Sequence, residues 1–110
     1  MKIALVTGSA KGLGAEIARF LAKEKYTVAV HFRKSAADAQ KVLALLKKDS
    51  PDSIALKGDL LNEKDVDKLI GEVFKRFGRI DLLINNVGNF LYKDFAKTTN
   101  AEFRDMVESN

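Results

Sequence analysis

Hydrophobic positions along the chain alternate between short apolar runs and longer stretches in which apolar residues recur at helical spacing. The short runs predict strands over residues 2–7, 26–32, 53–57 and 80–85. The stretches that follow them predict helices over residues 13–25, 36–48, 63–77 and 99–110. Strands joined by helices of this length lie parallel, and runs that are apolar on both faces indicate a sheet covered on both sides. The pattern therefore predicts a single α/β domain over residues 1–110 with an open, doubly wound parallel sheet.

The third predicted helix has the clearest pattern. Asn62 is expected to cap it, Asp65 to complement its positive end and Gly78 to end it. Its apolar stripe consists of Val66, Leu69, Ile70, Val73, Phe74 and Phe77. The first helix carries Leu13, Ile17, Phe20 and Leu21 at helical spacing, and the second is expected to direct inward Val42, Leu43, Leu45 and Leu46. A T-x-x-E capping box starts the last predicted helix.

Composition narrows the class of protein. With 46% hydrophobic and 31% charged residues, the chain has the make-up of a soluble globular domain. No apolar stretch approaches the roughly 20 residues of a membrane helix, and no secretion signal precedes the first strand. The absence of cysteine excludes disulfides and thiolate metal sites and favours the cytoplasm. The net charge of +4 comes from basic residues interspersed with acidic ones, so we expect no nucleic-acid partner and no membrane partner.

A glycine-rich segment, TGSAKGLG over residues 7–14, joins the first strand to the first helix. Glycine lets backbone amides approach a pyrophosphate closely, and the amino end of a helix favours negative charge. A tight turn that merely needs glycine is the alternative, but three glycines at this junction favour a nucleotide site. The spacing, G-x-x-x-G-x-G, differs from the commonest dinucleotide fingerprint. The residues expected to bind cofactor here are Gly8, Ser9, Lys11, Gly12, Leu13 and Gly14.

The end of the second strand indicates which cofactor is bound. Proteins that bind NAD usually place Asp or Glu there to hold the ribose 2′-hydroxyl. This chain instead has Arg33, Lys34 and Ser35, and an arginine fork suits a 2′-phosphate. The alternative is that the two basic residues are ordinary surface charges on a loop. We expect NADP(H) as the cofactor.

Two further segments complete a resemblance to the short-chain dehydrogenase/reductase family. Gly58-Asp59-Leu60 follows the third strand, and Asn85-Asn86-Val87-Gly88 follows the fourth, where the family has N-N-A-G. Together with the glycine-rich segment they stand in the family's order along all 110 residues. The resemblance implies a Rossmann-like sheet of four β-α units in the order 3-2-1-4, which is half of the full fold. It also implies that Lys11 accompanies NADP(H).

The same resemblance implies roles for the remaining site residues. The Asp59 side chain would meet the adenine amino group, and Leu60 would also bind cofactor. Asn86, Val87 and Gly88 would lie beside the cofactor, and Asn110 would belong to the catalytic group. Asp59 could instead be a turn or capping carboxylate, and Asn86 could simply end a strand. An asparagine fraying at a chain end is the alternative for Asn110.

The family's catalytic Tyr-x-x-x-Lys pair is missing from the 110 residues, because Tyr26 and Tyr92 are followed four residues later by Val30 and Ala96. We therefore interpret the chain as the front part of an NADP(H)-dependent oxidoreductase that acts on a carbonyl or imine compound, and expect the chain alone to be inactive. Parts of it resemble pteridine reductases and 3-oxoacyl-carrier-protein reductases, so the substrate stays open. A nucleotide-binding module without catalysis and a purely structural half-sheet are the alternatives. Because residues 80–85 would form a bare edge strand, we also expect a homo-oligomer.

Overall fold

A four-stranded parallel sheet forms the centre of the protein in the computed structural model, which describes residues 1–87. The strands are β1 (Lys2–Val6), β2 (Tyr26–Phe32), β3 (Ile54–Lys57) and β4 (Leu82–Ile84). The helices are α1 (Gly12–Lys23), α2 (Ala36–Leu46) and α3 (Glu63–Phe77). The strand order β3-β2-β1-β4 confirms the fold expected from the sequence. The predicted helix over residues 99–110 lies outside the described residues.

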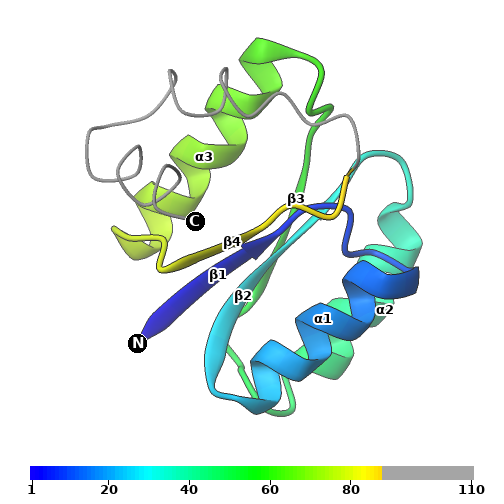
Figure 1. Ribbon diagram of the computed structural model, residues 1–110, viewed down its shortest axis with the longest axis vertical. Coiled ribbons are helices and arrows are strands. Elements are labelled where there is room, and N and C mark those ends of the chain that lie inside the picture. Colours follow the sequence, from blue (N-terminus) through cyan, green and yellow to red (C-terminus); the bar gives the residue numbers. More distant parts are fainter. Residues whose placement is uncertain (88–110) are drawn as a thin grey trace.

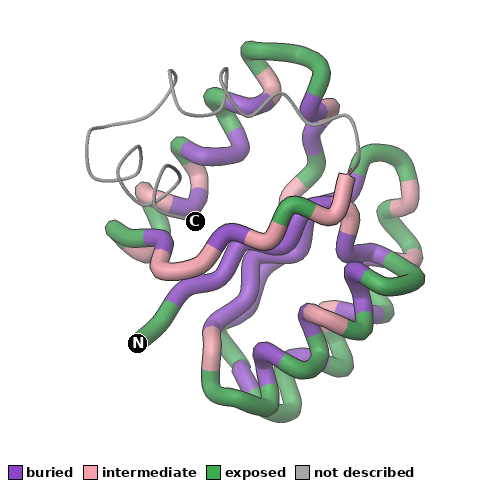
Figure 2. The backbone as a smooth tube through the Cα atoms, in the orientation of Figure 1, coloured by how far each residue is buried: buried purple, intermediate pink, exposed green. Residues whose placement is uncertain are grey.

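The helices cover the two faces of the sheet unequally (Figure 1). α1 and α2 lie together on one face, and α3 lies alone on the other. Two hydrophobic clusters result, one on each side. The central strands β1 and β2 are buried along most of their length (Figure 2), whereas the edge strands β3 and β4 have one buried residue each. Each strand alternates between the clusters, so that Ile3 and Leu5 face α3 while Ala4 and Val6 face α1 and α2.

α3 has the structure that its pattern predicts. The Asn62 side chain accepts a hydrogen bond from the Asp65 amide at 3.1 Å, which caps the first turn. Gly78 ends the helix in the left-handed conformation, with φ of 73°. The large aliphatic side chains of the stripe are fully buried, and its two phenylalanines pack partly buried at the margin of the same cluster. The predicted cap, stripe and end of α3 are confirmed.

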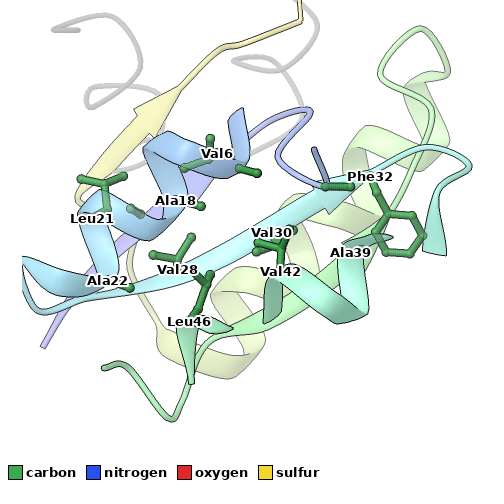
Figure 3. Close-up of a cluster of buried hydrophobic side chains, with 13 residues drawn as sticks. Val6, Ala18, Leu21, Ala22, Val28, Val30, Phe32, Ala39, Val42 and Leu46 are labelled. Atoms are coloured by element: carbon green, nitrogen blue, oxygen red, sulfur yellow. The ribbon is translucent and has the colours of Figure 1, made fainter. Parts of the chain in front are cut away.

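α1 buries a different face from the one its large apolar residues mark. Leu13 and Phe20 are 69% and 62% exposed, and Ile17 is only partly buried. The buried face consists of Gly14, Ala15, Ala18, Leu21 and Ala22. Figure 3 shows Ala18, Leu21 and Ala22 on this face. The predicted helix is present, but its spacing of large apolar residues does not mark the buried face, because α1 starts against the glycine-rich turn. A helix held that close to the strands accommodates mainly small side chains.

α2 likewise buries a narrower stripe than expected. Val42 and Leu46 are buried together with Ala39, at helical spacing (Figure 3). Leu45 is 43% exposed and Leu43 is only partly buried. The expectation that both residues point inward was therefore wrong for Leu45 and only partly correct for Leu43. One helix face spans too small an arc for four apolar residues among five consecutive positions.

β4 is attached to β1 by more than the strand ladder. The Ile3 amide donates to the Asp81 carboxylate at 2.7 Å, and the Asp81 amide donates to the Ile3 carbonyl at 2.8 Å. Partial burial acts to raise the pKa of Asp81, but the bonds from the Arg79 side chain and the Ile3 amide outweigh it and hold that pKa below its ordinary value. Leu83 is buried in the α3-side cluster. Association through this strand stays a prediction.

Candidate cofactor-binding site

The predicted site residues within residues 1–87 lie at the carboxyl ends of the four strands. Three adjoining hollows there share Arg33, and two of them also share Gly8 and His31. The third, of about 440 Å³, is lined in addition by Lys34, Lys57, Gly58, Asp59, Asp65 and Lys68. The inner hollow, of about 130 Å³, is lined in addition by Gly58, Asp59, Leu60, Leu61 and Val87. The basic hollow, of about 230 Å³, is lined in addition by Ala10, Lys11, Phe32, Lys34 and Ser35. Open α/β sheets bind their ligands at this edge.

A larger hollow of about 630 Å³ lies at the opposite edge of the sheet, beside residues such as Met1, Pro51 and Phe77. None of the predicted site residues lines it. Size alone therefore does not mark the site, whereas the carboxyl edge of the sheet combines hollows with converging polar groups.

Glycine is required at two positions of the turn by its geometry. Gly8 has φ of +60°, and a Cβ there would lie 3.0 Å from the Val87 side chain. A Cβ on Gly14 would come 2.2 Å from the Gly8 carbonyl oxygen and 2.7 Å from the Asn86 amide nitrogen. Because real Cβ atoms do not come that close to a backbone atom, α1 can meet the turn only through glycine. The interpretation as a tight turn is thus correct in part, since the tightness creates the cradle.

The amino end of α1 lacks the acidic residues that the other two described helices have. α2 places Asp38 in its first turn, and α3 places Glu63 and Asp65 there. α1 has no acidic residue in its first turn, and the Lys11 side chain at the cap position makes no capping hydrogen bond. The positive end of the α1 dipole is therefore not balanced by an anionic side chain, which suits a phosphate group.

The end of β4 braces the turn from the other side. The Asn86 amide donates to the Thr7 hydroxyl at 2.9 Å, and the Asn86 side chain donates to the Gly8 carbonyl at 3.2 Å. The Asn85 side chain accepts from the Val87 amide at 3.2 Å. Asn86 therefore does more than end a strand, because its side chain fixes the backbone of the turn.

Ser9 is completely buried and shapes the turn from within. Its hydroxyl donates to the Val6 carbonyl at 2.8 Å and accepts from the His31 amide at 3.1 Å. The Ser9 amide donates to the His31 carbonyl at 3.0 Å. These bonds tie the turn to the end of β2. Both bonds of the hydroxyl are made to backbone groups, and the role of Ser9 in cofactor binding stays a prediction.

His31 is the residue of this site that the sequence analysis missed. Its ring is buried at the end of β2 and lies between two loops. Nδ1 accepts from the Gly8 amide at 2.9 Å, and Nε2 donates to the Gly58 carbonyl at 2.8 Å. Burial lowers the pKa of His31 below its ordinary value of 6.5, and the Gly58 bond and the Asp59 charge offset this only in part. One polar ring within an otherwise apolar strand was the signal available in the sequence.

Asp59 lines the inner hollow and also stabilises its own turn. Its carboxylate accepts from the Leu61 amide at 3.0 Å, while its own amide donates to the Asp65 carboxylate at 2.9 Å. The Arg33 guanidinium lies 3.7 Å from the Asp59 carboxylate. Leu60 is buried under α3 and lines the same hollow. The two interpretations of Asp59, as turn carboxylate and as site residue, are compatible in this geometry.

The basic hollow collects the residues expected to select the cofactor. Lys11 reaches it from the turn, and Arg33, Lys34 and Ser35 reach it from the segment after β2. No carboxylate is among the described residues that line it. Gly88 and Asn110 lie outside the described residues. Within residues 1–87, no group of His, Cys, Asp or Glu side chains has the arrangement of a metal site.

A parallel sheet in the order 3-2-1-4 with a glycine-rich turn after its first strand defines a Rossmann-like nucleotide-binding fold. The model of the short chain dehydrogenase family matches residues 2–110, and the chain belongs to this family. Its relatives in the family are oxidoreductases. No helix in the described part of the chain has the length and apolar character needed to span a membrane.

Individual relatives resemble the chain along nearly its whole length. A hydroxynaphthalene reductase of Aspergillus fumigatus is 35% identical over 109 residues, which are 99% of this chain and 40% of the relative. A 3-oxoacyl-[acyl-carrier-protein] reductase of Staphylococcus aureus is also 35% identical, over 99% of this chain and 44% of the relative. A mutant of a Serratia marcescens short-chain dehydrogenase/reductase aligns with a TM-score of 0.73 and 30% identity, over 81% of this chain and 36% of that one. The chain thus spans less than half the length of these proteins.

Proposed function

We propose that this chain is the cofactor-binding part of an NADP(H)-dependent oxidoreductase, which transfers hydride between NADPH and a carbonyl-type substrate in the cytoplasm. The observation that carries the proposal is the basic hollow, where three cationic side chains and Ser35 line one site and no described carboxylate does. A carboxylate would repel a 2′-phosphate, whereas lysine and arginine stabilise it. The two relatives named above are reductases, which supports the direction of the reaction.

The proposed placement of the cofactor follows the shape of the inner hollow and the basic hollow. The pyrophosphate would lie at the amino end of α1, where Gly12, Leu13 and Gly14 offer backbone and the glycines leave room. The adenine would enter the inner hollow beside Asp59 and Leu60. When bound, the nicotinamide supplies the hydride. By family resemblance, Asn86, Val87 and Gly88 would line the path to the nicotinamide, and Asn110 would contribute to the catalytic group.

The ion pair between Arg33 and Asp59 does not prevent this use of Arg33. The nitrogen–oxygen distance is 3.7 Å, and the Arg33 side chain is 60% exposed. Exposed pairs of this kind contribute at most about 1 kcal/mol. A charge-assisted hydrogen bond to a phosphate contributes about 1.5–3 kcal/mol, so a 2′-phosphate can compete for the guanidinium.

Charge reversal at Arg33 tests the proposal. Arg33→Asp should weaken binding of NADP(H) at least about tenfold and change binding of NAD(H) far less, as measured by calorimetry. Lys23→Asp is the matched control, because Lys23 lies at the far end of α1, roughly 18 Å from the turn and beyond the screening length of about 8–10 Å. Equal losses for both cofactors, or an equal effect of the two substitutions, would contradict the assignment.

A second prediction concerns turnover by the 110 residues alone. We propose that they bind cofactor without catalysing reduction, because they contain no Tyr-x-x-x-Lys pair to protonate the product. General acid catalysis is worth a factor of about 10²–10⁴. The absorbance of NADPH should stay constant when the chain is mixed with a ketone. Sustained oxidation of NADPH in that assay would show that the active site is misassigned.

A further inference from the structure

The His31 ring joins the two loops that form opposite walls of the proposed cofactor site. The Gly8 amide, in the glycine-rich turn, lies 2.9 Å from Nδ1, and the Gly58 carbonyl, before Asp59, lies 2.8 Å from Nε2. The residue is 2% exposed, so water cannot replace either bond. Within residues 1–87, no other side chain forms hydrogen bonds to both loops.

The two bonds fix the protonation state of the ring. An amide N–H can only donate, so Nδ1 must present a lone pair to Gly8. A carbonyl can only accept, so Nε2 must carry the hydrogen towards Gly58. The neutral Nε2–H tautomer alone satisfies both loops. In the protonated ring, an Nδ1–H group would face the Gly8 N–H, and one donor would be left without an acceptor.

We propose that His31 is a positioning residue whose neutral Nε2–H tautomer holds the glycine-rich turn against the Gly58–Leu60 wall, and that protonation of its ring releases the turn and weakens cofactor binding. The effect on cofactor binding rests on the proposed function. The role of the His31 tautomer in holding the turn concerns the cofactor-free protein. His31 would act through Gly8 and Gly58, because its ring is buried and both of its nitrogens are engaged by these two residues.

Several charged groups lie near the His31 ring and concern its protonation. The Asp59 carboxylate favours the protonated form. The other charged groups near the ring are the cationic side chains of Lys11, Arg33 and Lys34, which line the basic hollow with it. Burial is the largest influence and lowers the pKa of His31 below 6.5. The neutral form therefore prevails at pH 7. The effect should appear only as the pH falls through the lowered pKa.

The direction of the pH effect follows from linkage. Because the unfolded chain binds this proton more readily than the folded one, the contribution of His31 to stability is complete above pH 6.5 and declines as the pH falls towards the folded pKa. If cofactor binds only the neutral form, affinity falls by up to about tenfold per pH unit below that pKa. The 2′-phosphate itself titrates near pH 6, so a variant without an imidazole must serve as the reference.

Two amide substitutions separate the two bonds of the ring. His31→Asn can keep an oxygen acceptor near the position of Nδ1, whereas His31→Gln can keep a donor near the position of Nε2. We expect His31→Asn to bind NADP(H) within about threefold of the unaltered chain at pH 8, and His31→Gln to bind roughly tenfold more weakly. Between pH 8 and 5, affinity of the unaltered chain should fall more steeply than that of His31→Asn. Equal affinities of the two variants, or parallel pH profiles, would overturn the proposal.

Nuclear magnetic resonance of the cofactor-free chain gives a second readout that depends neither on cofactor binding nor on the folding of a variant. The ring nitrogens of His31 should report the Nε2–H tautomer at pH 7, and the Gly8 amide should shift with the His31 titration. An Nδ1–H tautomer, or a cationic ring at pH 7, would overturn the proposal. If the ring behaves as expected but no NADP(H) binds, the proposed function fails and the structural role of His31 stands.

Discussion

The two helical layers of this small domain are built in opposite ways. α3 buries Val66, Leu69, Ile70 and Val73, which are the large apolar residues of its sequence. α1 buries mostly glycine and alanine and leaves Leu13 and Phe20 exposed. Both helices are amphipathic and pack on the same sheet. The difference between them lies in how closely each helix must approach the strands.

A helix has to approach the sheet closely only at the candidate cofactor site. α1 begins at the turn that follows β1, and Gly14 lies against the Gly8 carbonyl. α3 begins after the Asp59 loop, and an added Cβ on its own glycine, Gly71, would meet no atom within 4 Å. The α1 layer is therefore shaped by the cradle at its amino end, and the α3 layer by ordinary burial of apolar surface. Small residues in a helix can thus mark a site.

The largest expected effect is a contrast between two glycine-to-alanine changes. Gly14→Ala should destabilise the protein by about 3 kcal/mol or more, because its Cβ would overlap the Gly8 backbone. Gly71→Ala should stabilise it by about 0.5–1 kcal/mol, because alanine is the better helix former and the position is open. Urea unfolding of both variants measures the difference.

Cofactor binding sharpens this contrast. Gly14→Ala should also abolish NADP(H) binding under conditions in which the variant stays folded, whereas Gly71→Ala should bind as the unaltered chain does. Similar unfolding free energies for the two variants would mean that α1 does not approach the turn as described.

A smaller difference in stability is expected between alanine substitutions of one large apolar residue from each layer. Leu69→Ala removes a fully buried side chain from α3 and should cost about 2–5 kcal/mol. Phe20→Ala removes a larger side chain that is 62% exposed on α1, and should change stability by only about 0.5 kcal/mol. Thermal unfolding compares the two. A loss of stability on Phe20→Ala as large as that on Leu69→Ala would mean that Phe20 is buried, contrary to the structure.

The same contrast explains which parts of the fold hydrophobic periodicity could predict. It placed α3 correctly, because burial there depends on side-chain size and a stripe of large residues marks the buried face. It predicted the α1 helix but does not mark its buried face, because close contact there requires small side chains, and a hydrophobicity pattern gives glycine and alanine little weight. The strand order could be predicted only through the family resemblance, since periodicity alone does not assign neighbours in a sheet.

The site could be predicted where residue type carries the chemistry. Lys11, Arg33, Lys34 and Asp59 do line adjoining hollows at one edge of the sheet. The role of His31 could not be predicted, because its partners are the backbone groups of Gly8 and Gly58, 23 and 27 residues away in sequence. The buried bonds of Ser9 were missed for the same reason, since they are made to backbone. Backbone partners leave no pattern in the sequence.

Selection of a 2′-phosphate by the basic hollow can be tested by a calorimetric comparison of two cofactors. The unaltered chain is titrated with NADP(H) and with NAD(H) at pH 7.5 and moderate salt. Our account predicts that NADP(H) binds at least about tenfold more tightly, since one charge-assisted contact from Lys11, Arg33 or Lys34 suffices for that factor. Equal affinity for the two cofactors, or tighter binding of NAD(H), would contradict it.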